Sequence, residues 1–304
     1  MIEAQALTKR YGEKVAVDDL TFTVKPGVVT GFLGPNGAGK STTIRMIMGL
    51  DAPTSGEVTV NGRRYAEHSA PLREVGALLE ARAVHTGRSA YNHLLALAVS
   101  NGIPRRRVDE VIGLVGLDAA ARKRVGGFSL GMGQRLGIAA ALLGDPATLV
   151  LDEPVNGLDP QGILWIRTLL RGLAEEGRTV FVSSHLMSEM ALTAEHLIVV
   201  GRGRLIADTS VSEFTESASR NTVRVRSPQA ARLRSLLTGP EVTVTSAEEG
   251  LLDVSGLSAT EIGLVACQQQ IPLEELTPVR ASLEEAFMEL TDDAVEYKTE
   301  RQAS

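Results

Sequence analysis

Apolar and polar positions along the first 200 residues predict strands and helices. Apolar, β-rich runs predict strands at residues 2–7, 20–24, 28–33, 55–62 with a closing turn, 75–79, 147–153 and 179–185. Apolar residues at helical spacing predict helices over residues 42–50 and from Pro160 to about Glu176. Asp159 is the expected cap of the second helix, with Pro160 in its first turn.

Residues 88–144 differ in pattern from the segments on either side. Apolar positions at helical spacing predict helices over residues 91–99, 107–115 and 132–143. This stretch is therefore predicted to be a helical insertion between strands.

The last third of the chain has its own alternation of elements. Strands are predicted at residues 222–226, 241–245, 251–255 and 271–276, and helices at 228–237 and 258–270. The order β-α-β-β-α-β predicts a small C-terminal α+β (ferredoxin-like) appendage. An amphipathic helix over 282–290 closes this accessory domain, expected at 219–291, and residues 292–304 are predicted to be a disordered tail.

Composition narrows the class of protein. The 304 residues are 43% hydrophobic and carry a formal net charge of −6, which is typical of a globular protein and predicts no nucleic acid partner. Cys267 is the single cysteine, so a reducing, cytosolic setting is expected. No apolar run reaches 18 residues, and residues 1–5 lack the pattern of a signal peptide.

The stretch from Gly34 to Ser41 fits the phosphate-binding loop G-x-x-x-x-G-K-[ST] between a predicted strand and a predicted helix. Glycines let backbone N–H groups turn toward an anion, and the helix N-terminus adds a partial positive charge. Lys40 is expected to reach the β- and γ-phosphates, and Ser41 to hold Mg²⁺. A chance glycine turn in this context is the weaker interpretation.

A buried strand ends in the adjacent carboxylates Asp152 and Glu153. Neighbouring side chains of a strand point to opposite faces, so the two cannot serve the same purpose. We expect Asp152 in the magnesium shell and Glu153 as the general base that orients an attacking water.

Three further side chains are candidates for contacts with a nucleotide. Tyr11 can stack on an adenine ring or simply end a strand. Ser129 precedes an apolar helix, so it caps that helix and can supply a second anion contact. His185 ends a strand, where a polar group can sense a terminal phosphate.

Together these motifs, in this order and spacing, resemble the ATP-binding subunit of an ABC transporter over roughly residues 1–215. The resemblance implies an α/β fold with a P-loop NTPase (RecA-like) core, a β-subdomain and a helical subdomain at about 81–144, within a domain of residues 1–218. It also implies that ATP and Mg²⁺ are bound, with Glu153 and His185 catalytic and with Ser41, Glu80 and Asp152 at the metal. The implied nucleotide-binding residues are Tyr11, Gly34, Asn36, Gly37, Ala38, Gly39, Lys40, Ser41, Thr42, Ser129, Gly131 and Asp159.

The chain departs from the pattern of that family in three features. Its signature Leu-Ser-Gly-Gly-Gln is Phe-Ser-Leu-Gly-Met at residues 128–132, which keeps Ser129 and Gly131. Glu80 replaces the usual glutamine, so either its metal contact is stronger or its role has moved. Asn156 replaces a serine or threonine. Glu80 and the altered signature resemble the subgroup that exports drugs and antibiotic peptides.

The resemblance implies a Mg-dependent ATPase that forms a homodimer, or pairs with a second ATPase subunit, and drives membrane permease subunits from the cytoplasmic face of the plasma membrane. An importer ATPase is the nearest alternative, against which Glu80, Met132 and the C-terminal pattern argue. A non-transport ABC ATPase would carry two cores or long coiled coils, which this chain lacks. A P-loop kinase or GTPase leaves the signature segment and His185 unexplained.

Overall fold

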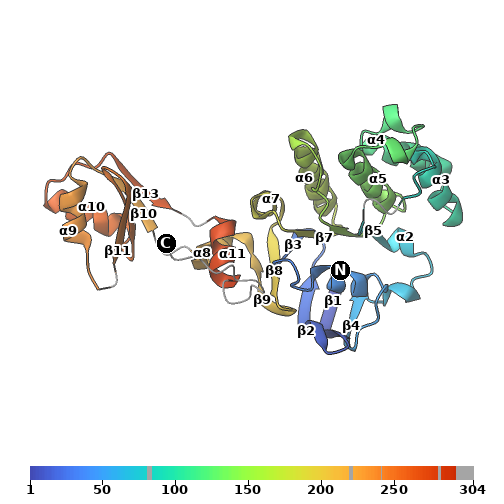
Figure 1. The fold of residues 1–304 in the computed structure, drawn as a ribbon, viewed down its shortest axis with the longest axis horizontal. Coiled ribbons are helices and arrows are strands. Elements are labelled where there is room, and N and C mark those ends of the chain that lie inside the picture. Colours follow the sequence, from blue (N-terminus) through green and yellow to red (C-terminus); the bar gives the residue numbers. More distant parts are fainter. Residues whose placement is uncertain (81–83, 219–221, 241, 280–281, 292–304) are drawn as a thin grey trace. The chain divides into compact units, whose positions relative to one another are not determined.

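A computed structural model describes residues 1–80, 84–218, 222–240, 242–279 and 282–291. Residues 1–211 form one compact unit and residues 212–290 a second (Figure 1). No helix in the described part of the chain is long and apolar enough to cross a membrane. The two units are described separately below.

The first unit is built around a six-stranded sheet in the order β5-β6-β7-β3-β8-β9. Its pairs are parallel except for β8 and β9. Strand β3 leads into the phosphate-binding loop and is buried along its length, as is typical of a central parallel strand. The bounds are β3 (Val29–Leu33), β5 (Val75–Leu78), β6 (Thr148–Asp152), β7 (Thr179–Ser184), β8 (His196–Gly201) and β9 (Arg204–Ser210).

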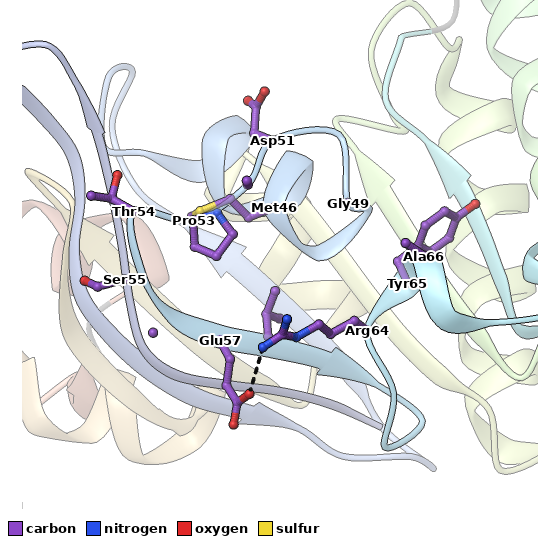
Figure 2. Close-up of a pocket in the computed structure, with 13 residues that line it drawn as sticks. Met46, Gly49, Asp51, Pro53, Thr54, Ser55, Glu57, Arg64, Tyr65 and Ala66 are labelled. Atoms are coloured by element: carbon purple, nitrogen blue, oxygen red, sulfur yellow. Dashed lines mark ion pairs between the residues drawn. The ribbon is translucent and has the colours of Figure 1, made fainter.

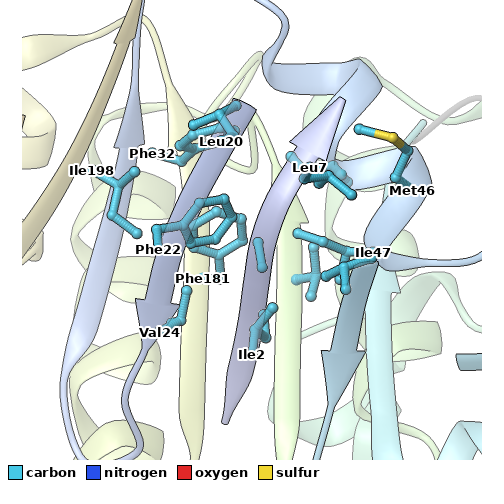
Figure 3. Close-up of a cluster of buried hydrophobic side chains, with 14 of the residues drawn as sticks. Ile2, Leu7, Leu20, Phe22, Val24, Phe32, Met46, Ile47, Phe181 and Ile198 are labelled. Atoms are coloured by element: carbon cyan, nitrogen blue, oxygen red, sulfur yellow. The ribbon is translucent and has the colours of Figure 1, made fainter. Parts of the chain in front are cut away.

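An antiparallel sheet in the order β2-β1-β4 packs with helix α1 against the large sheet. Figure 3 shows the side chains between these layers, among them Phe22, Phe32 and Phe181, whose ring centroids lie 5.0–6.0 Å apart. Phe32 of β3 and Ile44 of α1 both belong to this core, so the loop between these two elements is anchored at both of its ends. The bounds are β1 (Ile2–Tyr11), β2 (Lys14–Val24), β4 (Ser55–Val60) and α1 (Lys40–Ile47).

The predicted helical insertion is confirmed. Helices α3 (Ala90–Ser100), α4 (Arg105–Leu114) and α5 (Leu130–Leu142) lie within two residues of the predicted ends. Ser89 and Ser129 cap α3 and α5, each accepting a hydrogen bond from a backbone N–H three residues on. Helices α6 (Pro160–Glu175) and α7 (Met187–Thr193) lie on the side of the large sheet opposite the antiparallel sheet (Figure 1). Shorter helical segments are η1 (Tyr65–Glu67), α2 (Pro71–Glu74), η2 (Asp118–Ala120) and η3 (Val125–Gly127).

The second unit contains the predicted β-α-β-β-α-β order. Its four strands form an antiparallel sheet in the order β11-β12-β10-β13. Buried side chains from helices α9 and α10 pack against the apolar positions of the strands, which gives this unit its own core. The bounds are α8 (Val211–Ala218), β10 (Thr222–Arg226), α9 (Ala230–Leu237), β11 (Thr243–Glu248), β12 (Leu251–Ser255), α10 (Ala259–Gln268), β13 (Glu275–Val279) and α11 (Leu283–Thr291).

Some predicted boundaries differ from the observed ones. The last strand was predicted at 271–276, but the Ile271 N–H bonds to the Ala266 carbonyl and so finishes helix α10. The Pro272 carbonyl then accepts a hydrogen bond from Ser227, which places this segment in the connection before β13. Residues 212–218 belong to the second compact unit. The domain boundary expected at residue 218 stays a prediction. The predicted tail at 292–304 lies outside the described residues.

Candidate active site

The loop between β3 and α1 lines a cavity of about 500 Å³. Gly39 has a φ of +100°, and a Cβ at this position would lie 2.5 Å from the Ala16 carbonyl oxygen, so the loop requires glycine here. Within the described part of the chain, the N–H groups of Gly37 and Gly39 have no acceptor. Unpaired N–H groups before a helix N-terminus are suited to bind an anion.

Lys40 begins helix α1, and its side chain folds back along the loop. Its Nζ donates hydrogen bonds to the Gly34 carbonyl at 2.6 Å and to the Pro35 carbonyl at 3.3 Å, and the residue is only 8% exposed. Burial lowers the pKa of the ammonium group, whereas the carboxylates of Glu153 and Asp152 oppose that shift. A buried cation held by neutral carbonyls can turn to the stronger acceptor that a phosphate offers.

Ser41 and Asp152 meet on the wall of the same cavity. The Ser41 hydroxyl donates to Asp152 Oδ2 at 3.1 Å, and the other Asp152 oxygen accepts a short hydrogen bond from Ser183. A hydroxyl and a carboxylate are hard oxygen ligands of the kind that a divalent cation prefers. No group of three or more His, Cys, Asp or Glu side chains among the described residues could hold a metal. A cation here would therefore share its shell with phosphate oxygens and water.

Glu153 lines the cavity next to Asp152. Its carboxylate Oε2 lies 2.7 Å from His185 Nδ1 at the end of β7, and the Glu153 N–H donates to the Ser183 carbonyl at 3.2 Å. The Glu153 side chain is about one-fifth exposed, while the histidine is half exposed. This places a carboxylate, oriented by a histidine, where it can accept a proton from a water in the cavity.

Tyr11 stands at the rim of the cavity with 49% of its surface exposed. Its hydroxyl donates to Asp51 Oδ2 at 2.9 Å, and Arg45 donates to the same oxygen at 2.8 Å. The Arg45 bond, followed by the Tyr11 bond, lowers the pKa of Asp51 to about 2. Lys9 Nζ lies 5.1 Å from the centroid of the tyrosine ring. The ring is thus anchored at its hydroxyl and accessible to a ligand.

The signature segment lies elsewhere. Ser129 is absent from the lining of the loop cavity and lines a separate hollow of about 260 Å³. Its hydroxyl caps helix α5 by accepting from the Met132 N–H at 3.2 Å. A Cβ on Gly131 would lie 2.8 Å from the Gly157 carbonyl oxygen, so glycine allows the close approach to the turn before α6. Within one chain, then, the two predicted anion contacts line different cavities.

The other predicted site residues are placed as follows. Asn36, Ala38 and Thr42 line the loop cavity. Gly34 is buried directly after β3 and reaches the site only through its carbonyl. Asp159 caps α6, accepting from the Gly162 N–H at 2.9 Å, as predicted. Glu80 is exposed after β5 and is not part of the cavity lining.

A second cavity, of about 430 Å³, lies beside the C-terminal end of α1 and strand β4. Figure 2 shows Met46, Pro53 and Tyr65 around it and the ion pair of Arg64 with Glu57, at 3.6 Å, on one side. None of the predicted site residues lines this cavity. Of the residues described above, Asp51, which accepts a hydrogen bond from Tyr11, also lines this cavity.

Two residues of the site were not predicted. Ser183 bonds to both Asp152 and the Glu153 backbone, and the buried Gln134 donates to the Glu153 carbonyl at 3.0 Å. Gln134 could have been noticed as a polar residue in the first half of a helix whose second half is apolar. Ser183 gave no signal, because serine is common at strand ends.

A strand, an anion-binding loop and a helix, with a second strand that supplies Asp152 and Glu153, fit a nucleotide-binding site of the P-loop class. Comparison with known proteins gives the family. A family model described as "ABC transporter" matches residues 17–156, and one described as "Domain of unknown function (DUF8746)" matches residues 221–284.

The chain is 37% identical over 309 residues to the uncharacterized ABC transporter ATP-binding protein YhcH of Bacillus subtilis (strain 168), covering 97% of each protein. It is 44% identical over 211 residues to the bacitracin transport ATP-binding protein BcrA of Bacillus licheniformis, covering 68% of this chain and 69% of BcrA. A solved dimeric bacterial ABC transporter cassette has a TM-score of 0.64 at 26% identity, covering 69% of this chain and 99% of the cassette.

The chain belongs to the family of ABC transporter ATP-binding proteins. It is an ATP-binding subunit that hydrolyses ATP, with the cassette fold that its motifs predicted.

Proposed function

We propose that this ATPase dimerises on ATP and powers a membrane permease that exports drugs or antibiotic peptides. The observation that carries the ATPase part is Glu153, which is held by His185 beside the loop cavity of Lys40 and Ser41. The export part is supported by the similarity to BcrA, named as a bacitracin transport protein, and by the altered signature at residues 128–132. The subunit then works at the cytoplasmic face of the plasma membrane.

The loop cavity is the proposed nucleotide site. Tyr11 stacks on the adenine ring, and the N–H groups of residues 36–42 with Lys40 bind the phosphates. Glu153 acts as the general base that orients the attacking water, and His185 senses the terminal phosphate while it holds Glu153. Support comes from the shared cavity and from the 2.7 Å contact between Glu153 and His185.

Mg²⁺ is the proposed metal, which neutralises charge that develops on the phosphates. Ser41 and Asp152 hold it, as their 3.1 Å contact on the cavity wall suggests. Glu80 joins this shell in the assembled, nucleotide-bound subunit. Its exposed place after β5, next to the β6 strand of Asp152, leaves it able to do so.

The partner copy completes each site in this proposal. Ser129, Gly131 and Asp159 of one chain meet the nucleotide held by the loop of the other. The dimeric structure of the related cassette supports this arrangement, as does the separation of Ser129 from the loop cavity within one chain.

The substitution Glu153→Gln tests the catalytic assignment. We expect ATP binding to persist while phosphate release slows by about 10²-fold or more, since a positioned general base contributes about 10² to 10⁴. Glu110→Gln, on an exposed glutamate of α4 that pairs with Arg107, serves as the control and should leave both unchanged. Turnover of Glu153→Gln within a few-fold of wild type would remove Glu153 from this role.

Purification of the tagged subunit from detergent-solubilised membranes tests the transport assignment. A polytopic membrane protein should come with it. Recovery of ribosomes or DNA in its place would contradict the proposal.

A further inference from the structure

Gln134 connects helix α5 to the carboxylate that lies at the hydrolysis site. It is 4% exposed, and its Nε2 donates a 3.0 Å hydrogen bond to the main-chain carbonyl of Glu153. Helix α5 begins directly after Ser129, whereas Glu153 follows strand β6. The bond therefore joins the helical insertion to the site in the core.

The backbone of Glu153 has a conformation that needs such support. Its φ is +51°, in the left-handed region that residues with a Cβ rarely adopt. On one side of the residue, the N–H donates to the carbonyl and the hydroxyl oxygen of Ser183, at 3.2 and 3.1 Å. On the other side, the carbonyl accepts from Gln134 Nε2 at 3.0 Å and, over a longer distance of 3.3 Å, from the Asn156 N–H in the following turn. Both peptide groups that flank Glu153 are thus tied to neighbouring elements.

We propose that Gln134 is a positioning residue for hydrolysis, which holds Glu153 in this left-handed conformation so that its carboxylate stays at the cavity beside His185. The proposal rests on the function proposed above for Glu153. If the carbonyl lost the bond from Gln134, only the longer bond from the Asn156 N–H would hold it, so the peptide group could rotate and carry the carboxylate away from the attacking water. Nucleotide binding would persist, because Gln134 is not among the residues that line the loop cavity.

Two substitutions separate the hydrogen bond from packing. Gln134→Met keeps the length of the side chain but removes the donor. Ile138→Met, on the same helix and also buried, is the control for a change of core shape. We expect kcat of Gln134→Met to fall about ten-fold, the rate effect of losing about one well-placed hydrogen bond. The Kd for ATP should stay within about two-fold, and Ile138→Met should resemble wild type in both.

Gln134→Glu supplies a second readout. Glutamate has the same shape but can donate to the Glu153 carbonyl only when it is protonated. The ratio of kcat for Gln134→Glu to kcat for wild type should therefore rise as the pH falls from 8 to 6. A structural role alone would change this ratio only as far as the folded fraction of the variant changes with pH, which circular dichroism over the same range measures.

Glu153→Gln, assayed alongside, distinguishes the possible failures. If it lowers kcat by 10²-fold but Gln134→Met behaves like Ile138→Met, the positioning role is wrong while the role of Glu153 stands. If Gln134→Met loses ATP binding together with turnover, Gln134 supports the fold rather than Glu153 and the inference is overturned. If Glu153→Gln itself turns over normally, the proposed function fails first.

Discussion

The phenol oxygen of Tyr11 lies 2.9 Å from Asp51, a residue that follows helix α1 and is also bonded to Arg45 of that helix. The Tyr11 ring at the rim of the cavity is thereby joined to helix α1, which begins where the phosphate-binding loop ends. Its position is set before a nucleotide arrives, which reduces the entropy lost on binding.

Tyr11→Phe removes this hydroxyl and keeps the ring. We expect the Kd for ATP to rise about three- to ten-fold, as for loss of one hydrogen bond, with kcat at saturating ATP unchanged. Fluorescent-nucleotide titration measures the affinity. Tyr65→Phe, at the second cavity, is the matched control and should bind ATP like wild type. An unchanged Kd for Tyr11→Phe would show that the bond to Asp51 does not position the ring.

Glu80→Gln tests the proposed charge at the metal. If Glu80 joins Ser41 and Asp152, its neutralisation should raise the Mg²⁺ concentration for half-maximal hydrolysis several-fold and leave ATP binding nearly intact. Phosphate release against Mg²⁺ concentration gives the result. An unchanged Mg²⁺ titration, with loss of stimulation by the membrane partner, would place Glu80 at the subunit interface instead.

His93 makes the stability of the helical insertion sensitive to pH. Burial, and next the charge of Arg88, lower the pKa of His93 below its ordinary value of 6.5. The unfolded chain therefore binds a proton that the folded chain does not, so the free energy of unfolding should fall as the pH drops below about 6.5. Urea unfolding at pH 7.5 and 5.5 should show a smaller loss for His93→Gln than for wild type. The exposed His85→Gln is the control, and equal losses for wild type and His93→Gln would refute the prediction.

A crosslink tests whether two copies share each site. Asn36 and Leu130 are both exposed, so cysteines there can react, once the exposed Cys267 is replaced by serine. Asn36→Cys in one tagged copy and Leu130→Cys in another, both with Glu153→Gln, should give a dimer-sized band with a short bis-thiol reagent and ATP. A mixture in which all copies carry the same one of the two cysteines should not give this band. An internal crosslink in a chain with both, without any dimer band, would mean that the motifs meet in cis.

The sequence sufficed for the parts of the site that depend on local chain order. The loop from Gly34 to Ser41 and the pair of Asp152 and Glu153 each lie within a few residues of a strand end, so their positions follow from the strand pattern. Parallel strands then bring those ends to one edge. His185 follows from the same reasoning, as the residue after a third strand, whereas for Tyr11 the residues alone left stacking and a strand-end role open and the family resemblance decided between them.

The supporting hydrogen bonds of the site could not be predicted, because they join residues that are far apart in the sequence. The bond from Gln134 to Glu153 and that from Ser183 to Asp152 arise from packing that no local pattern records. The strand predicted at 271–276 was misplaced for a local reason instead: the Ile271 N–H caps helix α10 by bonding to the Ala266 carbonyl, and the strand runs from Glu275 to Val279.

The place of β3 in the middle of the large sheet has a consequence for synthesis on the ribosome. Val29 pairs with Val180, and Thr30 pairs with His196, so both neighbours of this strand are made long after it. Until they emerge, the apolar strand that precedes the phosphate loop has open edges, a condition that invites aggregation. The nascent ATPase can therefore acquire its nucleotide site only when nearly the whole first unit has left the exit tunnel.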